Sequence, residues 1–495
     1  MSEQQASYRQ IFKATSIFGG VQVFSIFISL IRSKFIAVIL GPAGMGISGL
    51  LTSTTGFITA LTNFGLGTSA VKSVVAASTT GDETKVSKVV TVLRRLVWIT
   101  GMLGTILTAV LSSWLSQLTF GNRDYTFAFI WISITLLFMQ LSSGQMVVLQ
   151  GLRRLNHLAK ANVIGLAIGL IISIPIYYIW RLEGIVPVLI ICAFINLLVS
   201  WYFAYKTGIK SVKISSEKFF LEGKEMLTMG FMLSLSGIIS YGASYVVRIY
   251  VSNMDGIEQV GLYNAGFAII NTYVGMVFSA MGTDYYPRLS AIAQDNINSR
   301  QLINQQAEVA ILILAPILIV FMTFINWIVI IIYSQKFTAV NPMIQWAALG
   351  MYFKAASWSI GFILLAKGAT KTYFWNEMLA NFYILGFNIV GYWLAGLEGL
   401  GISFLLSYFI YLLQIFLVAK FKYDFTFNKC FYKVFGLQVF FGFLCFTILK
   451  TYKTPMTYFF CTPIILTSAL FSYRELNRRI DLEALFRRQL NKHKR

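Results

Sequence analysis

The sequence predicts an all-α integral membrane protein with fourteen transmembrane helices. Of its 495 residues, 57% are hydrophobic and only 12% are charged, whereas soluble domains carry roughly a quarter charged residues. A helix that crosses a bilayer needs about 20 mainly apolar residues, and the chain supplies such runs repeatedly. Because open sheet edges are not tolerated in lipid, we expect every run to be helical.

The first apolar run is too long for a signal-peptide core and lacks a small-x-small cleavage site, so we expect a retained helix. The predicted spans are, in chain order, 16–40, 47–70, 91–116, 126–148, 161–180, 185–205, 226–251, 260–281, 304–333, 343–366, 373–395, 399–419, 434–449 and 455–473.

The cations outside the spans predict the orientation. If the N-terminus is cytoplasmic, 29 of the 40 Lys and Arg residues fall on the cytoplasmic side and five on the other. Cytoplasmic loops are enriched in Lys and Arg, so both termini should be cytoplasmic. This distribution explains most of the net charge of +21 without a nucleic-acid partner.

Several function classes are excluded. No predicted loop much exceeds about 20 residues, so the chain has no room for a soluble catalytic domain. No G-x-x-x-x-G-K-[ST] motif is present to bind ATP. Two His and four Cys, without ligand spacing, predict neither a metal centre nor a cofactor. A transporter, a channel or an intramembrane enzyme remains.

Spans 1–6 and 7–12 show signs of an internal repeat. Leu182-Glu183-Gly184 and Leu397-Glu398-Gly399 occupy equivalent links, and glycine-bearing segments at 44–49 and 260–266 follow the first span of each half. Two parallel six-helix lobes commonly enclose a central substrate path. The predicted organisation is an N-terminal lobe (1–206), a C-terminal lobe (207–421), two appended helices (422–473) and a charged cytoplasmic tail (474–495).

Six cations fall within the predicted spans, where each costs at least ~2.5 kcal/mol on insertion scales. Arg94 and Arg95 lie one turn inside span 3 and favour snorkelling to the headgroups, so they are weaker site candidates. Arg32 lies near the membrane midplane on a stripe with Ser25 and Ser29, and we expect it to face a polar interior. Lys34 lies about 200° further around the helix and is more suited to snorkelling, although it remains a candidate.

Span 7 carries one polar stripe that ends in Arg248. Its other members are Ser234, Gly237, Tyr241, Ser244 and Tyr245. Lys354 lies near the middle of span 10, where snorkelling is hardest. Small residues share its helix face, which favours the wall of a cavity over simple helix packing.

Acidic residues do not balance these cations. The carboxylates in or near the spans are Asp284, Glu308 and Glu377, all close to cytoplasmic ends; Glu377 is a weaker candidate for the site. A cationic lumen predicts an anionic cargo, and the guanidinium fork of Arg suits phosphate.

Topology and motifs together resemble the polysaccharide-transport branch of the multidrug/oligosaccharidyl-lipid/polysaccharide exporter superfamily, and especially the Wzx-type flippases. The stretches that carry the resemblance are Leu40-Gly41-Pro42-Ala43-Gly44-Met45-Gly46, Val260-Gly261-Leu262-Tyr263-Asn264, Tyr286-Pro287-Arg288-Leu289-Ser290, Phe353-Lys354-Ala355-Ala356 and Leu365-Ala366-Lys367-Gly368-Ala369.

The resemblance implies a V-shaped, MATE-like fold in a Gram-negative inner membrane. It implies a cargo of oligosaccharide linked to undecaprenyl pyrophosphate, such as an O-antigen or enterobacterial common antigen unit, flipped to the periplasmic leaflet. It further implies that Arg32, Arg248 and Lys354 line the lumen, that membrane lipids surround the protein, and that a polysaccharide polymerase and a chain-length regulator are its partners.

Two alternatives stay open. A drug or cation antiporter of the same superfamily would need essential acids deep in its lumen, and spans 1–7 offer none. A membrane polysaccharide polymerase or glycosyltransferase would need a sizeable extramembrane loop with catalytic residues. The longest predicted periplasmic link, about 117–125, contains only Arg123 and Asp124 as charged residues. We therefore expect a transporter and not an enzyme.

Overall fold

The computed structural model describes residues 24–209, 211–452 and 455–480. Every regular element in these ranges is a helix, as the sequence predicts. Nine of the described helical runs are long and apolar enough to cross a bilayer. Residues 16–23 of the predicted first span, Lys210, Lys453 and the tail from residue 481 lie outside the described ranges.

The chain divides into two compact units, which are described separately. Unit 1 comprises Met1–Asn264 and Ile332–Phe337, and unit 2 comprises Ala265–Ile331 and Thr338–Arg495. The lobe boundary at residues 206 and 207, which the repeat predicts, remains a prediction.

The first described helix of unit 1 covers residues 24–39. Its other helices are α2 (Gly41–Thr62), α3 (Leu66–Thr79), α4 (Glu83–Val110), α5 (Ser112–Phe120), α6 (Thr126–Gly151), α7 (Leu155–Trp180), η1 (Arg181–Gly184), α8 (Ile185–Tyr205), α9 (Ser216–Asp255) and most of α10 (Ile257–Ala268).

The predicted span 47–70 is broken in the structure. Phe64 and Gly65 take left-handed φ angles of 48° and 63°, which an α-helix cannot contain. The break is tightly packed, because a Cβ at Gly65 would collide with the carbonyl oxygen of Gly230. The turn between α3 and α4 ends in a helix cap: the carboxylate of Asp82 accepts a hydrogen bond from the backbone N–H of Thr84 at 2.9 Å at the start of α4.

Helices α7 and α8 form an antiparallel hairpin through the short η1 turn. The Cys192 thiol donates to the carbonyl of Gly169 at 3.7 Å, and a Cβ at Gly165 would meet the amide of Asn196. A step of four residues back along α7, from Gly169 to Gly165, corresponds to a step of four residues on along α8, from Cys192 to Asn196, as an antiparallel pair requires. The predicted link at Leu182-Glu183-Gly184 therefore reverses the direction of the chain between α7 and α8.

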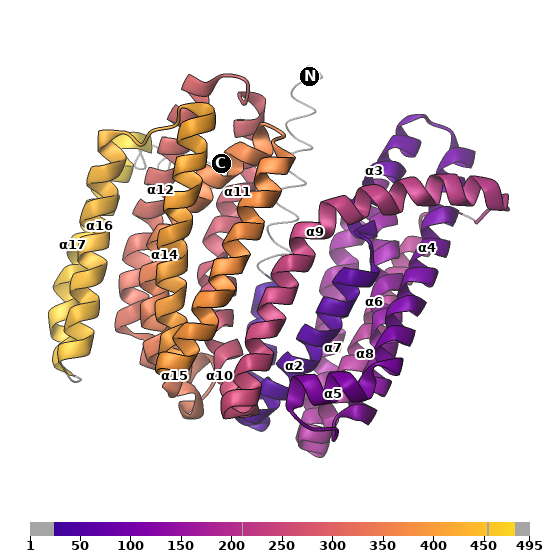
Figure 1. Ribbon diagram of the computed structural model, residues 1–495, viewed down its shortest axis with the longest axis horizontal. Helices are drawn as coiled ribbons and strands as arrows, with labels where there is room; N and C mark the ends of the chain where they lie inside the picture. The colour runs from indigo at the N-terminus through magenta and orange to yellow at the C-terminus, as the bar shows by residue number, and fades with distance from the viewer. Residues whose placement is uncertain (1–23, 210, 453–454, 481–495) are drawn as a thin grey trace, which may run out of the picture. The chain divides into compact units, whose positions relative to one another are not determined.

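The long helix α9 packs along the rest of unit 1. Figure 1 shows its first turns lying across α3 and α4 before it runs on beside α2. Near its end, the Tyr245 hydroxyl lies 2.6 Å from the Thr119 hydroxyl of α5. Asn253 donates to the carbonyl of Leu118 at 3.4 Å, so α5 is fastened to α9 at two points.

The two glycine-bearing segments that suggested the repeat pack against each other within unit 1. A Cβ at Gly46 would collide with the carbonyl oxygen of Ile257, and a Cβ at Gly261 with that of Pro42. Helices α2 and α10 thus approach closely at these positions, where only glycine leaves room.

Unit 2 begins within α10 and is helical throughout its described part. Its elements are η2 (Ile269–Val274), α11 (Met276–Ala291), α12 (Asn296–Thr323), α13 (Ile325–Ile332) except its last residue, the second half of η3 (Gln335–Val340), α14 (Asn341–Ala366), α15 (Thr370–Tyr423), α16 (Lys429–Thr451) and α17 (Met456–Ile480).

The run of 54 residues called α15 is a hairpin of two helices. Ala395 and Gly396 leave the helical conformation, with φ angles of −144° and 54°. Across the reversal, the Ser403 hydroxyl donates to the carbonyl of Phe387 at 2.6 Å. These two arms match the predicted spans 373–395 and 399–419.

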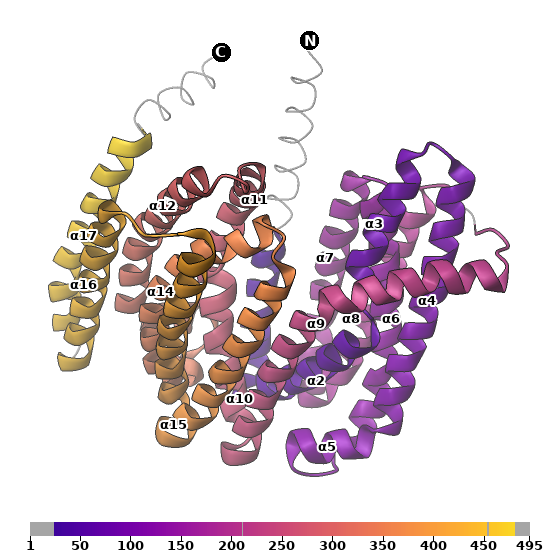
Figure 2. The ribbon, with the colours of Figure 1, turned by 45° about the horizontal axis from the view of Figure 1, so that its top comes forward.

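Helices α16 and α17 lie side by side (Figure 2) and are fastened to unit 2 at both ends. At one end, Arg479 pairs with the buried Glu308 of α12 at 3.1 Å. At the other, Lys450 pairs with Glu398 of α15 at 2.5 Å. Between them, the fully buried Gln438 donates to the Ser472 hydroxyl of α17 at 2.9 Å.

Candidate functional site

Lys354 of α14 has polar and aromatic partners from two other elements of unit 2. Its ammonium donates to Oδ1 of Asn271 in η2 at 3.0 Å. The same nitrogen lies 4.9 Å from the ring centre of Tyr408 and 5.5 Å from that of Phe404, both on α15. Within the described residues Lys354 forms no ion pair, so these partners hold its charge without neutralising it.

Asn271 belongs to a π-helical turn that sequence reasoning missed. The backbone N–H of Gly275 donates to the carbonyl of Ile270 at 3.1 Å, a bond that spans five residues. A Cβ at Gly275 would strike the carbonyl of Asn271, so the tight turn leaves no room for a side chain there. π-Helical turns are rare and are frequent at functional sites.

Arg248 of α9 is held by neutral groups within unit 1. Its Nε donates to Oδ1 of Asn264 at 2.8 Å, and its Nη1 to the carbonyl and hydroxyl oxygens of Ser244. The guanidinium carbon lies 5.3 Å from the ring centre of Tyr263. The predicted polar stripe therefore does engage Arg248, through Ser244.

Arg32 points into the α7–α8 hairpin. Its Nη2 donates to Sγ of Cys192 at 3.6 Å, and the buried Tyr177 of α7 lies close to the guanidinium. In the part of the chain that the structure describes, no carboxylate pairs with Arg32. A thiol and a phenol are neutral groups, so they do not balance the guanidinium charge.

The remaining candidates on the first helix and on α9 differ in exposure. Lys34 donates to the carbonyl of the buried Tyr333 at 2.7 Å. Ser29 and Tyr241 are exposed, whereas Tyr245 is buried and engaged with Thr119.

Arg94 contacts the segment that leads from α8 to α9, and Arg95 contacts the first turns of α9. Arg94 donates to the Ser211 hydroxyl at 3.0 Å, and the guanidinium of Arg95 lies 5.8 Å from the ring centre of Phe219. The backbone of Val212 is bonded to the Thr91 hydroxyl of α4 at 3.1 Å. Both arginines thus have partners within unit 1 that the sequence did not indicate.

Glu377 lies in the α15 hairpin, where it accepts a 2.5 Å hydrogen bond from the Tyr411 hydroxyl of the other arm. Beside it, Gln414 donates to Oδ1 of Asn376 at 2.8 Å. Tyr411 in turn contacts the ring of Tyr408, which places Glu377 and Lys354 at two ends of one row of side chains in unit 2.

Arg32 and Arg248 each have their own partners within unit 1, and Lys354 has its partners within unit 2. Their common role in one lumen stays a prediction. Among the described residues, no group of three or more His, Cys, Asp and Glu side chains is arranged to hold a metal.

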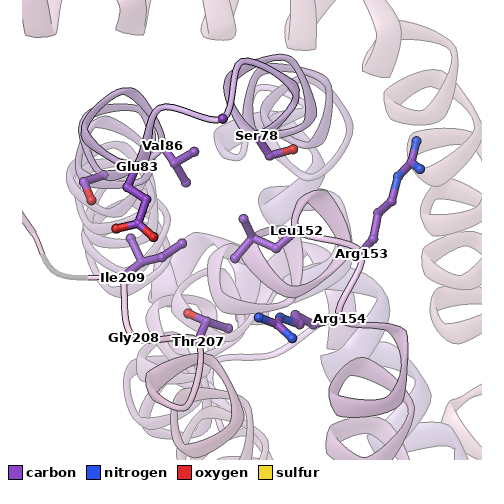
Figure 3. Close-up of a pocket in the computed structure, with 11 residues that line it drawn as sticks. Ser78, Glu83, Val86, Leu152, Arg153, Arg154, Thr207, Gly208 and Ile209 are labelled. Carbon is purple, nitrogen blue, oxygen red and sulfur yellow. The ribbon is translucent and has the colours of Figure 1, made fainter.

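Unit 1 also has a cavity of about 400 Å³ where helix ends meet. Figure 3 shows Arg154 directed toward Thr207, with Glu83 across the opening and Arg153 turned away. Leu152 lines its apolar side. The predicted in-span cations do not line this cavity.

The nine apolar helical runs of membrane length in the described part of the chain indicate a multi-pass membrane protein. A family model described as "Polysaccharide biosynthesis protein" matches residues 11–293, which is more than half of the chain. The protein belongs to this family.

One relative and two solved structures are similar to this chain. The Lipid III flippase of Escherichia coli (strain K12) is 21% identical over 392 residues, or 77% of this chain and 91% of that protein. The Lipid II flippase MurJ, in an inward closed conformation, has a TM-score of 0.71 at 14% identity, covering 94% of this chain and 99% of that chain. An inward-facing multidrug resistance MATE family transporter of the MOP superfamily has a TM-score of 0.68 at 14% identity, covering 82% and 94%. These structures share the fold.

Proposed function

We propose that this protein is a flippase that moves oligosaccharide linked to undecaprenyl pyrophosphate from the cytoplasmic to the periplasmic leaflet of the inner membrane. Membership of the polysaccharide biosynthesis family and similarity to a protein named Lipid III flippase support this cargo class. The fold shared with a lipid flippase supports the transport mode.

The observation that carries the proposal is the environment of Lys354. This lysine contacts one amide and two aromatic rings in a helix of membrane length, where a cationic side chain is costly. An anionic cargo offsets the free-energy cost of this cation only while the cargo is bound. A cation-exporting protein would need negative charge at such a position instead.

In this proposal the chain crosses the membrane fourteen times, with two six-helix lobes, two appended helices and both termini in the cytoplasm. Arg32, Arg248 and Lys354 line the path between the lobes, with Lys34 near them. The diphosphate pairs with the arginines, which offer forked donors, while the lipid tail stays in the bilayer. A polysaccharide polymerase and a chain-length regulator receive the product outside.

Transport then depends on the lobes opening alternately to each side. The cargo shifts this equilibrium only as far as it binds one state better than the other. The contacts between the protein and the anion must therefore differ between the two states.

The antiporter is the second candidate, because the fold is also that of a MATE transporter. Glu377 is a carboxylate in a membrane-length run, which such a mechanism could use. The cations in the other helices and the flippase relative favour the lipid-linked anion.

Reconstitution tests the proposal directly. The purified full chain is placed in vesicles with a fluorescent undecaprenyl-pyrophosphate-linked oligosaccharide, and a membrane-impermeant quencher reports the outer leaflet. The proposal predicts that the quenched fraction rises from about half toward all of the probe as lipid flips. Transport of a cationic dye without lipid flipping would establish the antiporter instead, and formation of a longer glycan would establish an enzyme.

A further inference from the structure

The contact between Lys354 and Asn271 has the chemistry of an exchangeable hydrogen bond. The acceptor is a neutral amide oxygen at 3.0 Å, on a residue that is exposed. An anion forms a stronger, charge-assisted bond with an ammonium than an amide does. The ammonium can therefore pass from Asn271 to an anionic ligand without losing a strong partner.

The π-helical turn explains how Asn271 reaches this position. A π-turn contains one residue more than an α-turn, and one residue corresponds to about 100° around a helix axis. The extra residue therefore rotates the side chains that precede it relative to those that follow it. It presents Asn271 to Lys354 of α14, from which 83 residues separate it along the chain.

The aromatic partners keep the ammonium in place during such an exchange. Tyr408 and Phe404 contact it through their ring faces, and Phe404 is itself buried and packed against Phe267. Rings offer no lone pair that competes with an anion for the ammonium N–H donors. They therefore fix the position of the charge while leaving its donors to Asn271 or to a ligand.

We propose that Asn271 is a positioning residue of the cargo site, which holds the Lys354 ammonium in the empty protein and yields it to an anionic group of the cargo. This inference rests on the proposed function. The anion is either the diphosphate of the lipid carrier or the carboxylate of an acidic sugar, since both supply the same oxygen acceptors.

Two substitutions at Asn271 separate this role from a structural one. Asn271→Asp keeps the size and the acceptor but neutralises Lys354 with a full charge, so anion binding falls by about tenfold or more. Asn271→Ala removes the competitor, so anion affinity stays equal or rises. A purely structural contact predicts the reverse order, because Asp preserves the hydrogen bond and Ala deletes it.

The experiment measures binding by isothermal titration of the purified full-length protein with inorganic pyrophosphate, glucuronate and neutral glucose. Asn326→Asp is the matched control. It adds the same charge to an exposed asparagine of unit 2 whose described partner is Asn341. Thermal unfolding of each variant confirms that it is folded.

The expected result is that Asn271→Asp weakens anion binding while Asn271→Ala and Asn326→Asp do not. A response confined to pyrophosphate assigns Lys354 to the carrier, and one confined to glucuronate assigns it to an acidic sugar. Equal binding by Asn271→Asp and the unaltered protein, weaker binding by Asn271→Ala, or no anion binding by the unaltered protein would overturn the inference. Because no transport is measured, a failure of lipid flipping is a separate outcome.

Discussion

The Arg248 guanidinium donates to Oδ1 of Asn264 at 2.8 Å, and the amide nitrogen of that same Asn264 lies against Gly49 of α2. Gly49 therefore leaves the space that the Asn264 side chain occupies, and Asn264 in turn binds Arg248. The arrangement connects the close packing of α2 and α10 to the position of Arg248.

Gly49→Ala should impair transport more than folding. The added Cβ collides with the tip of the Asn264 side chain, which can rotate away, but Arg248 then loses its acceptor. We expect lipid flipping to fall by about tenfold, an activation change of about 1.4 kcal/mol, with a normal yield of folded protein.

Gly261→Ala is the comparison for that variant. Its Cβ would meet the backbone carbonyl of Pro42, which cannot move without separating α2 from α10. We expect a loss of folded protein in size-exclusion chromatography. Equal yields and equal activities for the two variants would contradict the packing described for this helix pair.

Breaking the pair between Arg479 and Glu308 should loosen the α16–α17 hairpin. Glu308 is only 5% exposed, so Arg479→Ala leaves a buried carboxylate without its partner, at a cost of about 1–3 kcal/mol. We expect a lower thermal unfolding midpoint in detergent. Replacing both residues with leucine should recover most of the loss, since apolar pairs often replace ion pairs without penalty. An additive loss in the double variant would argue against the coupling.

The helix cap at Asp295 predicts a pH dependence. Backbone N–H groups of Asn298 and Ile297 donate to its carboxylate and lower its pKa. A carboxyl whose pKa is lower in the folded state stabilises the fold fully above its ordinary pKa, and the contribution is lost as the pH falls through the lower value.

Asp295→Asn keeps a capping side chain but removes this titration. Its unfolding midpoint should therefore fall less than that of the unaltered protein as the pH drops below the ordinary carboxyl pKa. Asp124→Asn, an exposed carboxyl outside any helix cap, should behave like the unaltered protein. Identical pH profiles for all three would show that the cap does not contribute.

Arg32→Lys and Arg32→Ala should distinguish the contribution of the positive charge of Arg32 to lipid flipping from that of its planar guanidinium. The guanidinium reaches Sγ of Cys192 at 3.6 Å, and a lysine retains charge there but not the planar fork. If Arg32 binds the diphosphate, flipping should fall about tenfold or more with alanine and partly with lysine. Full activity of Arg32→Ala at normal expression would remove this residue from the site.

The sequence alone predicts the all-helical class and two of the chain reversals. Apolar runs of membrane length have one viable structure, and Leu182-Glu183-Gly184 and the link around Gly396 do reverse the chain. Once the second reversal is known, the facing register of its arms brings Glu377 opposite Tyr411, so that pair could have been found from sequence spacing.

Other features depend on distant packing and carry no local signal. The stretch Ile269–Val274 reads as an ordinary apolar helix, and its π-turn is visible only in its backbone hydrogen bonds. The partner of Arg32 lies 160 residues away. The break at Phe64 was also missed, because a single phenylalanine–glycine pair within an apolar run does not predict a left-handed turn.

The most direct test of the central claim is the initial rate of lipid flipping by Lys354→Gln in reconstituted vesicles, relative to the unaltered protein. Lys450→Gln, which alters an ion pair at the far end of α16, is the matched control. The proposed cargo site predicts at least about tenfold slower flipping for Lys354→Gln, with partial recovery in Lys354→Arg and near-normal rates for the control. Flipping by Lys354→Gln at the unaltered rate would contradict the proposal that this lysine binds the anionic cargo.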